Sequence, residues 1–283
     1  MIYRIYNVFG DGPVGGNPTG VVYFEGAVDT DMMQRIARDL ALPDTLFIMP
    51  SENPGLLFTS LAFTPHQEIS ICGQGMIGGL YAWIEDHGLS DGSYKIGRRH
   101  GESIVRIADE PAAPVFVSMG RPTVTELDEG GKRVASEIAG SAESPRSAFI
   151  ELGRKRLVVQ VESEMLAQLH LEPSNVMDWC RGLGVTGIVL FSDEKRARSA
   201  NWRSRHFTTS LLGAEDAVTG GASAAILAFC LHFKGVRRDA TYLVHQGGFR
   251  TREGFIYVRL SQGSGEVFIG GSAVKTAEGI LDA

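Results

Sequence analysis

Two segments of the chain are apolar or small at almost every position. The first covers residues 73–84 and the second covers residues 220–231. A helix with so little polar surface is buried on all sides, so the pattern predicts two central helices of about three to four turns. Gly88 and Gly235 follow them, where the end of a helix favours a residue that accepts a positive φ angle.

Around these segments the pattern changes to short runs rich in Val, Ile, Phe and Tyr, separated by Gly, Pro, Asp and Asn. Such runs are typical of β-strands. In the first half they cover residues 2–9, 20–24, 45–49, 56–63, 103–108 and 115–118. In the second half they cover residues 147–152, 156–161, 187–192, 201–207, 242–246 and 255–260. Further helices are predicted at residues 29–40 and 175–182.

The stretch from Arg121 to Ala142 is polar, contains two adjacent glycines and is interpreted as the connection between two halves. Each half is then a curved, mostly antiparallel sheet wrapped around one buried helix, which is an α+β fold with two pseudo-repeated lobes. The predicted N-terminal lobe is residues 1–122, which residues 273–283 could complete. The predicted C-terminal lobe is residues 123–272.

The two apolar segments belong to an internal repeat. The pattern Glu68-x3-Cys72-Gly73 recurs as Glu215-x3-Thr219-Gly220, at an offset of 147 residues. Gly88 and Gly235 repeat at the same offset. The repeat places a small polar residue and a glycine at the start of each central helix, and two such starts facing each other would form a site between the lobes.

The start of each central helix is a predicted anion site. Backbone N–H groups there have no partner inside the helix, and the helix dipole is positive at this end. Glycines also let a ligand approach the backbone closely. The ligand type that fits such a site is a carboxylate or a phosphate.

Composition narrows the class of protein. The chain has 283 residues, 43% of them hydrophobic and 21% charged, which is enough for a core and about two domains. A formal charge of −6 argues against nucleic acid or an anionic membrane as the main partner. Cys72, Cys180 and Cys230 give no disulfide framework and no metal-ligand spacing. Without an apolar run of about 20 residues, we expect a cytoplasmic protein.

Six segments together resemble a known family. They are Val8-Phe9 with Gly16-Asn17-Pro18-Thr19-Gly20, Leu42-Pro43-Asp44-Thr45, Phe63-Thr64-Pro65-x2-Glu68-x3-Cys72-Gly73, Ser204-Arg205-x-Phe207, Gly213-x-Glu215-Asp216-x2-Thr219-Gly220, and Gln246-Gly247 with Arg252. In these segments the chain is similar to the phenazine-biosynthesis isomerase (PhzF-like) family, a branch of the diaminopimelate epimerase and proline racemase fold. The resemblance covers nearly the whole length.

The resemblance implies isomerase chemistry with no metal, no organic cofactor and a tendency to form homodimers. A carboxylate at the position of Asp44 removes a proton from a carbon of a small carboxylate-bearing metabolite. A dry pocket suits this reaction because desolvation strengthens a carboxylate as a proton acceptor. Asp216 is a candidate for a second acid or base. The residues expected to bind substrate are Asn17, Gly73, Gln74, Gly75, Arg205, Thr219, Gly220 and Gly221.

Three positions depart from the family pattern. Asp44 stands where the family usually has Glu, Gln74 where it has His, and Gly221 where it has Ser. A Gln orients a ligand by hydrogen bonds but does not shuttle a proton. These changes leave open whether the chain isomerises a different metabolite or is a catalytically lapsed homologue that only binds one.

Cys72 gives a second hypothesis. In the racemase branch of the fold, paired cysteines at the two helix starts act as base and acid, and a thiol at a helix N-terminus has a lowered pKa. The repeat puts Cys72 opposite Thr219, which excludes racemisation by two thiols. A cyclic imino-acid dehydratase or racemase that uses Cys72 alone remains an alternative.

Two further interpretations concern neighbouring residues. Residues 73–78 satisfy G-x-G-x-x-G, but the strand before them is very short and the acid expected about 20 residues later lies in a turn, so a Rossmann dehydrogenase is a weak alternative. On the strand before the second helix, Arg205 is predicted to face the site and His206 the opposite face of the sheet. Glu68 and Glu215 are expected to brace their loops.

Overall fold

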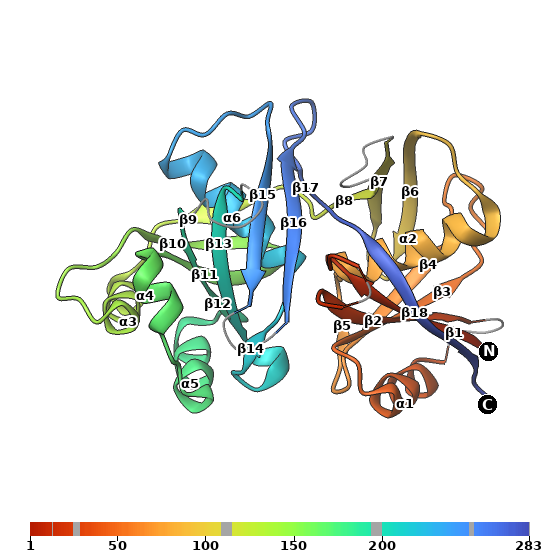
Figure 1. The fold of residues 1–283 in the computed structure, drawn as a ribbon, viewed down its shortest axis with the longest axis horizontal. Coiled ribbons are helices and arrows are strands. Elements are labelled where there is room, and N and C mark those ends of the chain that lie inside the picture. The colour runs from red at the N-terminus through yellow and green to blue at the C-terminus, as the bar shows by residue number, and fades with distance from the viewer. Residues whose placement is uncertain (13, 25–28, 109–114, 194–199, 249–251, 283) are drawn as a thin grey trace. The chain divides into compact units, whose positions relative to one another are not determined.

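The structure is a computed structural model that describes residues 1–12, 14–24, 29–108, 115–193, 200–248 and 252–282. Within these ranges helices and strands combine in an α+β fold, which confirms the predicted class (Figure 1). The chain divides into two compact units. The first unit is Met1–Met119 with Ile269–Ala283, and the second is Gly120–Phe268.

The first unit is built on a mixed sheet. Its strands pair in the order β18-β1-β2-β3-β4-β6-β7-β8, with the short β5 on β4. The pairs β2–β3 and β4–β6 are parallel and the others are antiparallel. The elements are β1 (Ile2–Val8), β2 (Asn17–Tyr23), α1 (Thr30–Leu40), β3 (Asp44–Met49), β4 (Thr59–Phe63), β5 (Glu68–Ile69), α2 (Gly73–His87), β6 (Gly92–Arg98), β7 (Glu102–Ile107), β8 (Val115–Ser118) and β18 (Ala273–Ile280).

The second unit repeats this arrangement. Its strands pair in the order β9-β10-β11-β12-β13-β15-β16, with β14 on β13 and parallel pairs β11–β12 and β13–β15. The elements are β9 (Thr123–Thr125), α3 (Glu129–Ala139), β10 (Ser147–Leu152), β11 (Arg154–Gln160), α4 (Ser163–Gln168), α5 (Pro173–Leu183), β12 (Gly187–Ser192), β13 (Trp202–Thr208), a 3-10 turn (Thr209–Leu211), β14 (Glu215–Asp216), α6 (Gly220–Phe233), β15 (Thr241–Gly247) and β16 (Glu253–Leu260). The strand β17 (Val267–Gly270) crosses the boundary between the units.

The last strand of the chain completes the sheet of the first unit. β18 follows the second unit in sequence but pairs with β1, whereas β9 belongs to the second unit and pairs with β10 of the same unit. The predicted central helices are confirmed as α2 and α6. α2 contacts β1, β2, β3, β8 and β18, which are spread across the sheet, so the sheet curves around the helix.

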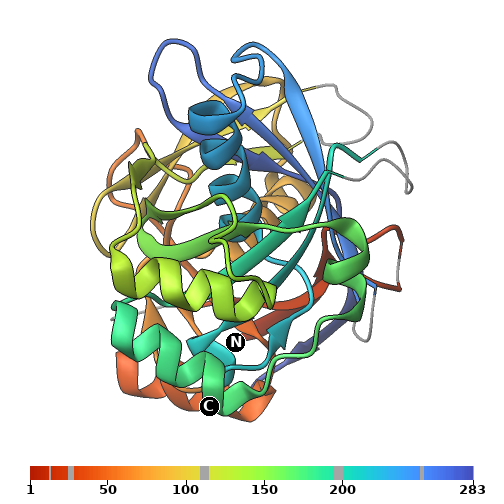
Figure 2. The same ribbon diagram turned by 90° about the vertical axis from the view of Figure 1, so that its left-hand side faces the viewer.

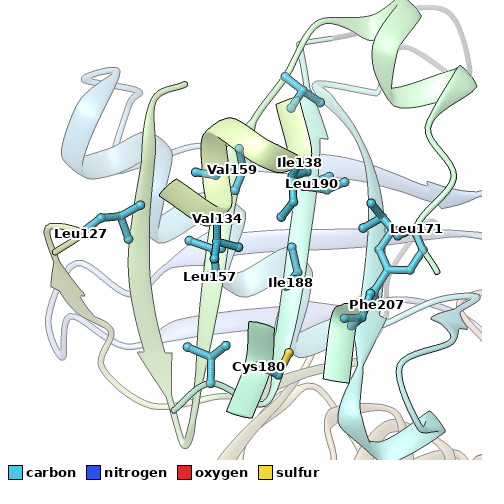
Figure 3. Close-up of a cluster of buried hydrophobic side chains, with 14 of the residues drawn as sticks. Leu127, Val134, Ile138, Leu157, Val159, Leu171, Cys180, Ile188, Leu190 and Phe207 are labelled. Carbon is cyan, nitrogen blue, oxygen red and sulfur yellow. The ribbon is translucent and has the colours of Figure 1, made fainter. Parts of the chain in front are cut away.

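The two faces of the second sheet are covered by different helices. A hydrophobic cluster joins β11, β12 and β13 to α3, α4 and α5, and it includes Leu157, Ile188 and Phe207 (Figure 3). α3 and α5 lie side by side on this face (Figure 2). Because side chains alternate along a strand, Arg156 and His206 lie on the opposite face, where α6 packs.

The first sheet is organised in the same way. Phe47 and Phe63 belong to a cluster with α1. Leu46 and Ile48 face the other way, because the position of a β-carbon on Gly79 of α2 lies 2.5 Å from Leu46 and 3.3 Å from Ile48. Alternation therefore puts Asp44, at the start of β3, on the face that α2 covers.

The stretch 121–142, interpreted as a connection, contains β9 and the helix α3 instead. Asp128 caps this helix by accepting the N–H of Gly131 at 2.7 Å. Val134 and Ile138 are buried against the sheet. This packing outweighs the low helix propensity of the two glycines. The strands β6, β17 and β18 and the helix α4 were also not predicted.

A cluster of charged side chains joins β1, α2 and β18 in the first unit and makes the stability of this unit depend on pH. Arg4 of β1 donates to both carboxylate oxygens of Asp86 at 2.8 and 2.9 Å, and to Glu278 of β18 at 2.9 Å. The hydrogen bonds from Arg4 lower the pKa of Asp86 below its ordinary value of 3.8. The stabilisation is therefore complete above pH 3.8 and is lost as the pH falls through the lower pKa of the folded state.

We expect the free energy of unfolding to fall below pH 4, and the Asp86→Asn protein to show a smaller fall over the same range, because its amide does not titrate. Urea denaturation at a series of pH values measures both slopes. Asp91→Asn, which changes an exposed aspartate in a turn, is the matched control. Equal slopes for the wild type and Asp86→Asn would contradict the prediction.

Candidate functional site

Cys72 caps the start of α2. Its Sγ accepts the N–H of Gly75 at 3.2 Å, and its carbonyl accepts the N–H of Met76 at 3.0 Å. The N–H groups of Gly73 and Gln74 belong to the first turn, which has no acceptor inside the helix, and no described residue accepts from them. Two backbone donors are thus available at this helix start.

Gln74 ties the start of α2 to β2. Its Oε1 accepts from Asn17 Nδ2 and its Nε2 donates to Thr19 Oγ1, both at 3.0 Å. All three side chains are buried. The predicted substrate residues Asn17 and Gln74 therefore lie together, and their contacts with each other and with Thr19 give Gln74 a positioning role.

Asp44 lies beside this cluster. In the parallel pairing of β2 with β3, Asp44 is the register partner of Thr19, which accepts the hydrogen bond from Gln74. Its side chain is half-buried. The candidate base is thus next to the start of α2, in the same unit and on the face that the helix covers.

The predicted role of the α2 glycines is only partly supported. A β-carbon on Gly73 would overlap Ile269, and one on Gly75 would lie 3.0 Å from Cys72 Sγ. Their missing side chains are therefore needed for packing inside the unit, and not to open a path for a ligand. Of these two glycines, only Gly73 has a backbone N–H that remains a candidate donor to substrate, because that of Gly75 is bonded to Cys72.

Thr219 does not cap α6, although it occupies the position that Cys72 has at α2. Its hydroxyl donates to Asp216 Oδ2 at 2.6 Å and accepts from Gln246 Nε2 at 3.1 Å. His206 Nδ1 lies 2.9 Å from the same oxygen. Because the single hydroxyl hydrogen goes to Asp216, His206 must donate from Nδ1.

This network leaves the start of α6 open. The N–H groups of Gly220, Gly221 and Ala222 have no acceptor among the described residues, one group more than at α2. Burial lowers the pKa of His206 below its ordinary value. The imidazole is therefore neutral at pH 7, with its proton on Nδ1, and it fixes the orientation of Thr219.

The prediction for Arg205 is wrong, because its guanidinium is occupied. Nε and Nη2 donate to the two carboxylate oxygens of Glu215 at 2.9 and 2.7 Å, and Nη1 donates to the carbonyls of Leu166 and Leu169. Arg205 therefore joins β13, β14 and α4. His206 faces the start of α6 instead, so the two residues have exchanged the faces predicted for them. The expected bracing roles of Glu215 and Glu68, which pairs with Arg99, are confirmed.

Arg156 is not among the site residues that the sequence predicts, where it is only the first residue of a strand. It lies in β11, is 4% exposed, and approaches Gly221 at the start of α6. Burial lowers the pKa of its guanidinium to about 9. The signal that could have identified Arg156 is its position in the repeat, because Arg156 in β11 is equivalent to Thr19 in β2.

The cap at Cys72 gives a testable stability difference. We expect Cys72→Ala to lower the free energy of unfolding by about 1 kcal/mol, because the N–H of Gly75 loses its acceptor. Cys72→Ser should recover most of this loss, since a hydroxyl is a good N-cap. Thermal denaturation of the three proteins measures the difference. Equal loss in both variants would mean that the cap contributes nothing.

Within the described ranges, no helix is long and apolar enough to cross a membrane. The same part of the chain contains no group of three or more His, Cys, Asp or Glu side chains arranged to hold a metal ion.

Solved structures define the class of this fold. A phenazine biosynthesis protein of the PhzF family from Bacillus anthracis aligns with a TM-score of 0.83 at 22% identity, covering 100% of this chain and 99% of that chain. A hydroxyproline epimerase from Agrobacterium vitis, solved with bound trans-4-hydroxy-L-proline, aligns with a TM-score of 0.66 at 14% identity, covering 99% and 91%. The fold is therefore shared by PhzF-like and racemase-like proteins.

The sequence itself gives the family. Residues 6–279 match the PhzC-PhzF family, described as "Phenazine biosynthesis-like protein", and the chain belongs to it. YfhB of Bacillus subtilis (strain 168), named an uncharacterized isomerase, is 26% identical over 287 residues, covering 98% of this chain and 97% of the relative. A trans-2,3-dihydro-3-hydroxyanthranilate isomerase from Pseudomonas chlororaphis is 26% identical over 230 residues, covering 78% and 76%. This membership removes the Rossmann dehydrogenase from consideration.

Proposed function

We propose that the chain is a cofactor-independent isomerase or epimerase that transfers a proton at a carbon of a small carboxylate-bearing metabolite. The observation that carries the proposal is the first helix start, where Asp44 is the register partner of Thr19, and Thr19 in turn is bonded to Gln74 at the start of α2. The proposal thus combines a carboxylate on β3 with the backbone N–H groups of Gly73 and Gln74, which have no acceptor among the described residues. Membership of a family whose relatives are named isomerases supports the same reaction class.

In this proposal Asp44 is the base. Its carboxylate takes the proton from the substrate carbon, and the electron pair left behind moves into the activating group next to that carbon. The proton then returns from the acid form of Asp44 to the same or another carbon. Partial burial of Asp44 suits the role, because a carboxylate that is less well hydrated is a stronger proton acceptor.

The free N–H groups stabilise negative charge. Those of Gly73 and Gln74 at α2, and of Gly220, Gly221 and Ala222 at α6, are fixed in place by their helices. Donors that are already oriented lose little by reorganisation when charge develops on a substrate oxygen. A helix start therefore both binds the carboxylate and favours the charged intermediate.

Asp216 and Thr219 have a supporting part in this scheme. The hydrogen bonds from Thr219 to Asp216 and from Gln246 to Thr219 hold the Asp216 carboxylate at the start of α6. Asp216 is the candidate to orient a hydroxyl or amine of the substrate. Cys72 is assigned a structural role, because its sulfur accepts the N–H of Gly75.

The experiment is deuterium incorporation from D2O into a panel of small amino, imino and cyclohexadiene carboxylates, followed by mass spectrometry. Isomerase chemistry predicts incorporation at one carbon of a panel member. Treatment with a thiol-alkylating reagent should leave this activity in the Cys72→Ser protein unchanged. Tight binding of a panel member without any exchange would refute the proposal in favour of a lapsed, metabolite-binding homologue.

A further inference from the structure

Arg156 is a buried cation without a counterion in the part of the chain that the structure describes. Its side chain is 4% exposed, its Nη1 donates to the carbonyl of Arg154 at 3.1 Å, and its Nε has no partner. It forms no ion pair with any carboxylate of the described residues; Asp216 acts on it only at longer range. Burying an unpaired charge is strongly unfavourable, and a bound anion would offset this cost by supplying the missing partner.

The guanidinium is directed at the start of α6. A β-carbon built on Gly221, the second residue of the helix, would lie 2.7 Å from Arg156 Nη2. The absence of a side chain at Gly221 is therefore what lets the guanidinium reach the helix. The N–H groups of Gly220 and Gly221 belong to the same first turn of α6, and they have no acceptor among the described residues.

At equivalent positions of the repeat, the approach of Arg156 to Gly221 replaces the hydrogen bond between Gln74 and Thr19. Gln74 and Gly221 are equivalent positions of α2 and α6. In the first unit Thr19 of β2 pairs with Asp44, the first residue of β3. Continuing the β11–β12 register by one residue pairs Arg156 with Gly187, the first residue of β12, so Arg156 is equivalent to Thr19. In the first unit Gln74 reaches from the helix to Thr19. In the second unit the direction is reversed, and Arg156 reaches from the strand to the helix.

The open edge of Arg156 has the geometry that binds a carboxylate. Nε and Nη2 lie on one edge of a guanidinium and present two parallel N–H groups. In Arg205 this same edge holds both carboxylate oxygens of Glu215. In Arg156 the hydrogen bond to the carbonyl of Arg154 comes from Nη1, so the edge formed by Nε and Nη2 is available to a ligand.

We propose that Arg156 binds a carboxylate of the substrate at the start of α6, together with the N–H groups of Gly220 and Gly221. The inference rests on the proposed function for the identity of the anion as a substrate group. It makes Arg156 a specificity-determining residue. A charged, two-pronged donor selects a carboxylate over an amide or a hydroxyl, because neither neutral group offsets the buried charge.

The test uses malonate as the probe and isothermal titration calorimetry as the measurement. We expect Arg156→Gln to weaken malonate binding by about 10- to 100-fold, the usual loss when a hydrogen-bonded charge pair is broken. Malonamide, which has the same shape but no charge, should not bind to the wild type. Arg181→Gln is the matched control, because it removes an exposed arginine from α5 with the same change in net charge. Equal affinity of Arg156→Gln and wild type for malonate would overturn the inference.

Stability separates a ligand-binding arginine from a structural one. Without malonate, Arg156→Met should unfold at the same temperature as the wild type or higher, because it removes an uncompensated buried charge. Malonate should raise the unfolding temperature of the wild type and not that of Arg156→Met. A variant that is less stable than the wild type and still stabilised by malonate would assign Arg156 a structural role.

Gly221→Ser keeps Arg156 and displaces its guanidinium. The new β-carbon would lie 2.7 Å from Nη2, so the flexible end of the arginine must shift away from the helix. The affinity of Gly221→Ser for malonate should therefore also be lower than that of the wild type. If the Arg156 variants do not fold, this variant tests the role of Arg156. Unchanged affinity in folded Gly221→Ser would contradict the inference.

The two proposals fail in different ways. Loss of malonate binding in Arg156→Gln, with no deuterium exchange by the wild type on any panel member it binds, would retain the anion site and reject the isomerase. Exchange by the wild type that persists unchanged in Arg156→Gln, with unchanged KM, would retain the isomerase and reject the role of Arg156.

Discussion

The Asp44→Asn protein is expected to fold normally and to lose about 10²- to 10⁴-fold or more of the deuterium exchange at the substrate carbon, the contribution that a positioned acid or base makes. Asn keeps the size of the side chain and removes its ability to accept a proton. The neighbouring contacts among Asn17, Thr19 and Gln74 do not need the charge. Mass spectrometry of the substrate, at matched protein concentration, measures the loss.

Asp39→Asn is the control, because Asp39 is exposed on α1, five residues before Asp44. It should exchange hydrogen at the wild-type rate. Asp44→Glu adds one methylene and moves the carboxylate by about one C–C bond, so it should lower kcat more than it raises KM if the base must be in place. A wild-type rate in Asp44→Asn would remove this residue from the mechanism.

The second large effect concerns Arg205. Replacing Arg205 with Met should lower the free energy of unfolding by about 3–5 kcal/mol, since it leaves a buried carboxylate without its partner. The side chains of Arg205 and Glu215 are 3% and 10% exposed, so water does not replace the lost contact. The carbonyls of Leu166 and Leu169 lose their donor as well. Urea denaturation monitored by fluorescence measures the change.

The double variant Arg205→Met with Glu215→Leu should be more stable than Arg205→Met alone, because no unpaired charge remains buried. Arg181→Met, on the exposed surface of α5, should change stability by less than about 0.5 kcal/mol. If Arg205→Met is as stable as this control, the ion pair does not hold β13, β14 and α4 together.

The central helices could be predicted because their signal is local. α2 and α6 are apolar on every side, and glycines with φ angles of 65° and 60° follow them at Gly88 and Gly235. α3 and β18 could not be predicted in this way. α3 contains adjacent glycines, and β18 is mostly exposed and polar. What forms them is packing and pairing with segments far away in the sequence.

The candidate site was predicted in part. The motifs led to the two helix starts and to Asp44, but the choice between Arg205 and His206 went wrong. Alternation says only that neighbours on a strand face opposite ways. Residues on both faces of β13 are buried, and α4 and α5 contact the strand, so the hydrophobic pattern does not tell which face a given residue takes. Arg156 was missed because its importance depends on the missing side chain of Gly221, 65 residues away.

The return of β18 to the sheet of the first unit has a consequence for protein synthesis. The second unit is continuous, and every strand of its paired sheet, from β9 to β16, leaves the ribosome before β18. The first unit begins with residue 1, yet β1 keeps one edge unpaired until β18 arrives. The half that is translated first is therefore completed last, and during that interval its open strand edge is exposed to other nascent chains.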